Sequence, residues 1–107
     1  MMLTIDPARS SLLVIDFQDR LMAAIDQADL RIAQAARLIR AAEVLGLPRH
    51  VTEQNPEKLG GTVPALDIPA GAALAKMDFD ATRDAAIAAA LAGDHALVVC
   101  GCEAHVC

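Results

Sequence analysis

Continuous apolar runs alternate along the chain with segments of helical periodicity. Residues 11–17 are almost entirely apolar and carry one acid near their end, which is typical of a strand buried on both faces of a parallel sheet. Residues 29–45 instead repeat apolar positions at helical spacing. Asp29 is a candidate N-cap for this helix, and Gly46 suits the left-handed residue that closes it before Pro48.

The rest of the chain predicts three more strands and one more helix. In chain order these are a strand at 48–54, a long loop rich in Pro and Gly with at most a short helical turn at 55–71, a short strand at 73–77, a helix at 83–92 capped by Thr82 and closed by Gly93, and a strand at 96–100 ended by Gly101. This alternation predicts an α/β fold with a mainly parallel sheet and right-handed crossovers.

Composition narrows the class of protein and its partners. A chain of 107 residues, 55% of them hydrophobic, has room for one domain with a buried core. The net charge of −5 disfavours nucleic acid and anionic membranes as partners. The longest apolar run, residues 85–92, is too short to cross a bilayer, and the N-terminus lacks the pattern of a signal peptide. We therefore expect a cytoplasmic protein.

Two charged residues stand in apolar surroundings. Asp16 comes at the end of the first predicted strand, where open α/β sheets bind ligands, although an acid there can also serve as a turn or cap residue. Lys76 lies inside the third predicted strand, where it could balance a carboxylate or an anionic intermediate. The alternative for Lys76 is an edge-strand lysine that reaches solvent.

The three cysteines, Cys100, Cys102 and Cys107, fall close together near the end of the chain. An odd number in one short segment is a poor disulfide framework and favours a reducing compartment. Cys107 follows a strand, a glycine and a short loop, where backbone N–H groups at a helix start would favour a thiolate and bind an oxyanion. The alternative is a buried structural thiol. With His105 the cysteines could also bind zinc, but four ligands on one short segment close a tetrahedron poorly.

Four segments together resemble the isochorismatase-like hydrolases, a family that includes the nicotinamidases. They are LLVIDFQDRL (12–21), VTEQNPEKLGGTVPAL (51–66), LAKMDF (74–79) and VVCGCEAHVC (98–107). The resemblance implies a three-layer, Rossmann-like α/β fold with strand order 3-2-1-4-5-6, of which this chain supplies the first four strands. Strands 1 and 4 are then neighbours, which would bring Asp16 to Cys107.

The resemblance also implies roles for individual residues. Asp16 would take the thiol proton of Cys107, and Lys76 would orient Asp16 and stabilise developing charge. The thiolate would attack the carbon of a small amide or a similar C–N bond and form a covalent intermediate. The other residues implied at the site are Gln54, Asn55, Phe17 and Phe79 as substrate-binding candidates, of which the two aromatic residues could stack on a substrate, and Cys102 and Glu103 in an oxyanion loop with a cis peptide between them.

Departures from the family pattern limit the chemistry. Nicotinamidases carry an Asp-x-His metal motif where this chain has residues 52–56, so we expect no metal, no other cofactor and no nicotinamide substrate. True isochorismatases lack the cysteine, so Cys107 disfavours vinyl-ether hydrolysis. Family members usually assemble, so we expect a homo-oligomer acting on a small-molecule substrate.

The family pattern extends beyond Cys107. We therefore expect residues 1–107 to form the N-terminal part of a hydrolase domain. A chain that truly ended there would leave strand 4 as an apolar edge, and we expect it to fold poorly or pair with a partner and to be inactive. A catalytically inactive interaction protein and a small Cys/His metal or redox module remain the alternatives.

Overall fold

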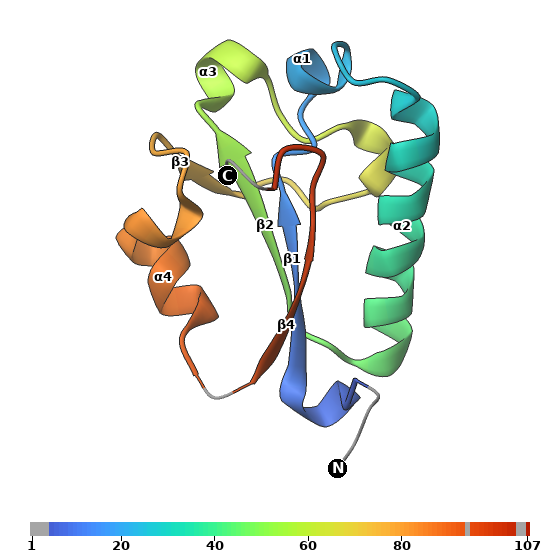
Figure 1. Cartoon of the computed structure of the whole chain (residues 1–107), viewed down its shortest axis with the longest axis vertical. Helices are drawn as coiled ribbons and strands as arrows, with labels where there is room; N and C mark the ends of the chain where they lie inside the picture. The colour runs from blue at the N-terminus through green and yellow to red at the C-terminus, as the bar shows by residue number, and fades with distance from the viewer. Residues whose placement is uncertain (1–4, 94, 105–106) are drawn as a thin grey trace.

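The computed structural model describes residues 5–93, 95–104 and 107. Four strands form one sheet: β1 (Ser10–Ile15), β2 (Arg49–Gln54), β3 (Leu74–Lys76) and β4 (Ala96–Cys100). Their order is β3-β2-β1-β4, and all neighbouring pairs are parallel. Helix α2 (Ala28–Leu45) covers one face of the sheet and α4 (Ala85–Leu91) the other (Figure 1). The predicted α/β fold and the order of the first four strands are therefore confirmed.

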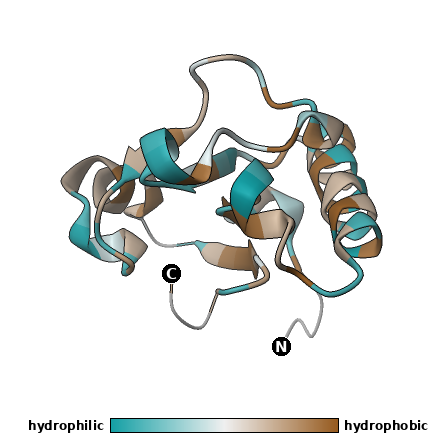
Figure 2. Ribbon diagram, turned by 90° about the horizontal axis from the view of Figure 1, so that it is seen from above, coloured by the Kyte–Doolittle hydropathy of each residue, from teal (hydrophilic) through white to brown (hydrophobic). Residues whose placement is uncertain are grey.

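Strand β1 lies at the centre of the core, and all six of its residues are buried. Because side chains alternate along a strand, Leu12 and Val14 face α2, where they pack in one cluster with Ala35 and Ile39. The opposite face lies toward α4, whose Ile87 is fully buried. Seen from above, the sheet runs between the two helices, and α2 carries both hydrophobic and hydrophilic residues (Figure 2). Burial on both faces explains the unbroken apolar run of β1.

Both helices start at other residues than the sequence predicts. Helix α2 begins one residue early, after Gln27 in the left-handed conformation with φ 54°, so Asp29 lies in the first turn instead of capping it. Helix α4 begins at Ala85, because the Asp84 carboxylate accepts the N–H groups of the first turn. Thr82 is therefore not its cap and lies in the preceding 3-10 turn (Ala81–Arg83). The predicted closure of α2 by Gly46 is confirmed, with φ 74°.

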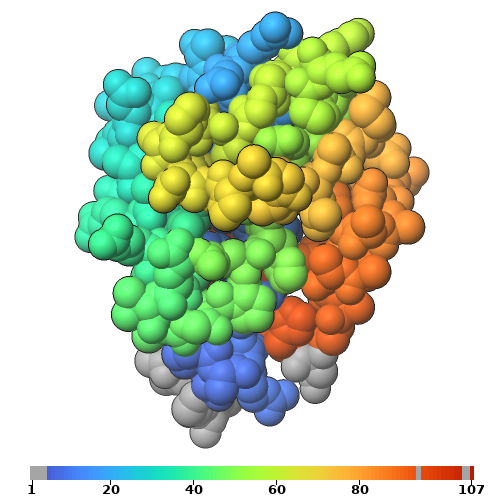
Figure 3. All heavy atoms as spheres, turned by 180° about the vertical axis from the view of Figure 1, so that it is seen from behind, coloured from blue at the N-terminus to red at the C-terminus, as the bar shows by residue number. Residues whose placement is uncertain are grey.

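The segment predicted as one long loop is well packed. It contains the short helix α3 (Pro56–Leu59) and a 3-10 turn (Pro64–Leu66), and Val63 and Leu66 are buried in the core. Figure 3 shows this segment in yellow, lying across the back of the molecule between α2 and the last part of the chain. A second short helix, α1 (Asp19–Met22), follows β1. Two backbone hydrogen bonds, from the Val63 N–H to the Phe17 carbonyl at 2.8 Å and from the Asp19 N–H to the Gly61 carbonyl at 3.1 Å, tie the 55–71 segment to the residues that follow β1.

Strand β4 is an edge strand of the sheet that the described residues form. In the described residues it pairs with β1 alone, and Leu97 and Val99 are 38% and 48% exposed. None of the helices in residues 5–93, 95–104 and 107 is long and apolar enough to cross a membrane.

Candidate active site

Asp16 lies directly after β1, at the end of the sheet where the strands point. Its backbone is left-handed, with φ 55°, which Asp tolerates better than most residues. The residue is 3% exposed. Thr52, at the same level of β2, holds it twice: the Thr52 carbonyl accepts the Asp16 N–H at 3.2 Å, and the Thr52 hydroxyl donates to Asp16 Oδ1 at 2.8 Å. The carboxylate is therefore fixed and shielded from water.

Lys76 ends β3 and reaches the same place from the other side of β2. Its Nζ lies 3.1 Å from Asp16 Oδ2, and neither side chain is more than 1% exposed. The ammonium also donates to Gln54 Oε1 at 2.7 Å and to the carbonyl oxygens of Phe79 and Asp78 at 3.0 and 3.2 Å. Such partners offset the cost of burying a charge. The alternative of a solvent-reaching edge lysine is therefore wrong.

Cys107 completes this group. Its carbonyl accepts the N–H of Ala81 at 3.0 Å, and its own N–H donates to the Glu103 carbonyl at 3.0 Å. Burial, followed by the hydrogen bond to Asp16 and the charge of that carboxylate, raises the pKa of the Cys107 thiol to about 11, although Lys76 acts in the opposite direction. The sequence predicted a stabilised thiolate. The structure instead has a protonated thiol beside a carboxylate, because desolvation and Asp16 both disfavour a second negative charge.

Gly101 is the first residue of the loop that leads from β4 to Cys107. A Cβ at that position would lie 3.0 Å from both the Cβ and the carbonyl oxygen of Ile15, which is tighter than nine in ten real Cβ contacts. Glycine lets the chain cross near the end of β1 without displacing Ile15. The close approach brings the loop after β4 over Asp16.

The predicted substrate-binding residues differ in how far they are buried. Both polar atoms of the Gln54 side chain are used internally, the oxygen by Lys76 and the nitrogen by the Met77 carbonyl. Asn55 is left-handed, and its N–H donates to the Lys76 carbonyl at 2.8 Å. Phe17 is buried in the core, whereas Phe79 is 64% exposed. The Phe79 ring is thus accessible, and its carbonyl holds Lys76.

The loop between Gly101 and Cys107 differs from the prediction in one respect. No described peptide bond is cis, so the expected cis peptide at Cys102–Glu103 is wrong. The loop turns with trans peptides, and the bond from the Cys107 N–H to the Glu103 carbonyl closes that turn. Among the described residues, no three or more His, Cys, Asp or Glu side chains are grouped as metal ligands, and His105 lies outside them.

Sequence reasoning missed two residues that build the site. Thr52 and Gln18 are both 0% exposed. The Gln18 amide donates to the carbonyls of Gln54 and Gly60 at 2.9 and 2.8 Å and accepts the Gln54 N–H at 2.7 Å, which ties the loop after β1 to the end of β2. A signal for Thr52 was its spacing from Gln54, since residues i and i+2 of a strand face the same side.

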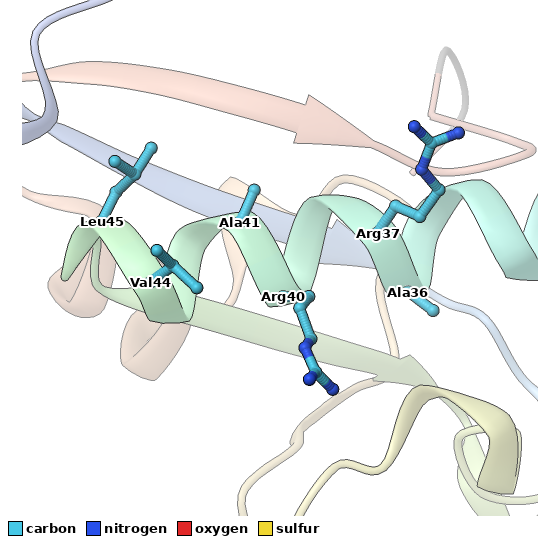
Figure 4. Close-up of a pocket in the computed structure, with 6 residues that line it drawn as sticks. All are labelled: Ala36, Arg37, Arg40, Ala41, Val44 and Leu45. Carbon is cyan, nitrogen blue, oxygen red and sulfur yellow. The ribbon is translucent and has the colours of Figure 1, made fainter.

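One surface hollow lies away from these residues. It runs along the outward side of α2, and Figure 4 shows Arg37 and Arg40 pointing to opposite sides of this helix. Its lining comes from α2 alone, and Val44 there is 80% exposed. It contains no acid, base or nucleophile of the group described above. A second hollow, lined in part by Phe17, Gly101 and Cys102, reaches the loop after β4.

Comparison with known proteins identifies the relatives of this chain. Isochorismatase domain-containing protein 1 of Danio rerio is 36% identical over 110 residues, covering 96% of this chain and 38% of the relative. Isochorismatase domain-containing protein 2 of the same species is 31% identical over 100 residues, covering 92% and 51%. The chain thus spans 38% and about half, respectively, of the length of these two curated relatives.

Solved structures share the fold. The MAR1 ribonuclease of Caenorhabditis elegans superimposes with a TM-score of 0.82 at 33% identity, over 96% of this chain and 55% of that one. A hypothetical protein from Trypanosoma cruzi gives 0.82 at 25% identity, over 99% and 57%. The model of the isochorismatase domain matches residues 10–107, and this chain therefore belongs to the isochorismatase family.

Proposed function

We propose that this protein is a cysteine hydrolase that cleaves a small amide or a similar C–N bond. Cys107 is the nucleophile, Asp16 the base and Lys76 the cation that orients Asp16 and stabilises developing charge. One observation carries the proposal: a buried Asp16–Lys76 pair, 3.1 Å apart, lies beside a thiol whose proton it can accept. Burying such a pair is costly for stability alone, and a thiol whose pKa is raised by burial and a neighbouring carboxylate, as that of Cys107 is, is typical of functional sites.

The proposed reaction has two halves. In the first, Asp16 takes the thiol proton while Sγ forms a bond to the substrate carbonyl carbon; the amine leaves with that proton, and a thioester remains. In the second, Asp16 takes a proton from water, the hydroxyl adds to the thioester carbon, and the thiol leaves with the proton. The Cys107 N–H is already bonded to Glu103, so other backbone N–H groups of this loop would hold the oxyanion.

Covalent trapping tests the proposal. Chloroacetamide at pH 7 should modify Cys107 faster than Cys100, measured by peptide mass spectrometry. Asp16→Asn should slow the modification of Cys107 at least tenfold. The thiol stays protonated at this pH unless a base removes its proton, and the thiolate is the reactive form. Thr82→Ala, an exposed change outside the site, is the matched control. Equal rates in the Asp16→Asn variant and the unsubstituted chain would contradict the assigned base.

Ribonuclease activity, named for the Caenorhabditis elegans protein, is the competing function. A net charge of −5 does not favour binding of a polyanion. We expect no cleavage of single-stranded RNA above the rate of a Cys107→Ala control. Cleavage that depends on Cys107 and Asp16 would replace the amide proposal with a phosphodiester substrate.

A further inference from the structure

The two oxygens of the Asp16 carboxylate have different surroundings. Oδ1 accepts the hydroxyl hydrogen of Thr52 at 2.8 Å, inside the protein. Oδ2 is buried and, apart from the Cys107 thiol that lies against this carboxylate, has no hydrogen-bond donor among the residues that the structure describes. Lys76 Nζ lies 3.1 Å from Oδ2 and balances its charge, but without the alignment of a hydrogen bond.

The hydrogen-bond partners of Lys76 explain why Oδ2 is left open. An ammonium group has three N–H donors. They are taken by Gln54 Oε1 at 2.7 Å, the Phe79 carbonyl at 3.0 Å and the Asp78 carbonyl at 3.2 Å. Lys76 thus supplies positive charge to Oδ2 without supplying a hydrogen. An open, charged oxygen in a dry site is suited to accept a proton.

Strand β2 provides both side chains that create this asymmetry. Thr52 and Gln54 are two positions apart, so they face the same side of the sheet, one toward β1 and the other toward β3. Thr52 is 0% exposed and Gln54 is 7% exposed. The Thr52 side chain is hydrogen-bonded to Asp16, and the Gln54 side chain to Lys76 and to the Met77 carbonyl. These are the side-chain hydrogen bonds of the two residues within the described part of the chain.

We infer that Thr52 and Gln54 are positioning residues that make Oδ2 of Asp16 the acceptor of the Cys107 proton. Thr52 occupies Oδ1, and Gln54 keeps a Lys76 N–H away from Oδ2. This inference rests on the proposed function and adds to it the oxygen that accepts the proton and the two residues that select it.

The test is the pH dependence of Cys107 modification by iodoacetamide, resolved from Cys100 by peptide mass spectrometry. Between acid and neutral pH the rate should depend on Asp16 as the base, and the midpoint is the pH at which the rate reaches half of its value at neutral pH. Thr52→Val removes a hydrogen bond to the carboxylate and should move this midpoint up by about one pH unit. Thr52→Ser keeps the hydroxyl and should restore it.

Gln54→Leu should move the midpoint in the opposite direction. It frees a Lys76 N–H to turn toward Oδ2, which stabilises the carboxylate and lowers the midpoint, again by about one pH unit. A purely structural role would not shift two neighbouring variants in opposite directions. Cys100, whose thiol pKa is raised to about 11 by burial and by Cys102, is the internal reference in every sample.

The outcomes separate the two proposals. If Asp16→Asn leaves the acid-to-neutral profile unchanged, the proposed function fails. If Asp16→Asn abolishes that profile but Thr52→Val and Gln54→Leu leave the midpoint in place or shift it equally, only the positioning roles are overturned. Circular dichroism verifies folding, and Thr52→Ala, with the same expected shift, replaces the valine variant if that variant is unfolded.

Discussion

Replacement of Lys76 by methionine tests the buried ion pair directly. Methionine nearly keeps the length of the side chain but removes the ammonium that faces Asp16 at 3.1 Å, with both side chains at most 1% exposed. Removing one member of a buried pair leaves an uncompensated charge and costs about 3–5 kcal/mol. Two backbone carbonyls and Gln54 also lose their donor. We expect a loss of at least about 3 kcal/mol in the free energy of unfolding.

Urea denaturation followed by circular dichroism measures this loss, and a double-mutant cycle isolates its cause. The Asp16→Asn/Lys76→Met chain has no unpaired charge, so it should be more stable than Lys76→Met alone. Arg83→Met is the matched control, because its partner Asp80 is 3.9 Å away and both side chains are more than half exposed, so the change should lie within about 0.5 kcal/mol. A loss below about 1 kcal/mol for Lys76→Met, or no recovery in the double variant, would refute the reasoning.

Three further predictions concern the surroundings of the site. Gly101→Ala should destabilise the protein by about 1–3 kcal/mol in urea, because the new Cβ would lie 3.0 Å from Ile15; an unchanged midpoint would contradict the close approach. Burial raises the thiol pKa of Cys100 and Cys107 from 9.0 to about 11. The unfolded chain then loses these protons first, so stability is full below about pH 9 and falls toward pH 11. Cys100→Ala should reduce this loss of stability, measured as the melting temperature at a series of pH values. An identical dependence of melting temperature on pH in the variant and the unsubstituted chain would refute the prediction. Asp84→Ala should cost about 1 kcal/mol, because its carboxylate caps α4 at 3.0 and 3.1 Å, with fraying visible by amide hydrogen exchange.

The sequence by itself determined the architecture around β1. An unbroken apolar run has one stable environment, a strand covered on both faces, and the structure buries all six β1 residues. Gly46 ends α2 with φ 74°, as its freedom from a Cβ predicted. The family segments indicated Asp16, Lys76 and Cys107 as a group, and the parallel order β3-β2-β1-β4 explains their meeting, because the ends of neighbouring strands lie together.

The tertiary structure alone decided the electrostatic state of those groups. Whether Lys76 reaches solvent or a carboxylate depends on which residues cover β3, and a local pattern does not contain that information. The thiol pKa of Cys107 is raised because burial and Asp16 act together, whereas strand-and-loop spacing predicted the reverse. Thr52 and Gln54 act through partners at the ends of two different strands, Asp16 after β1 and Lys76 in β3, which are 36 and 22 positions away in the chain. Hydrogen-bond competition among distant residues, not local propensity, makes one carboxylate oxygen the open acceptor.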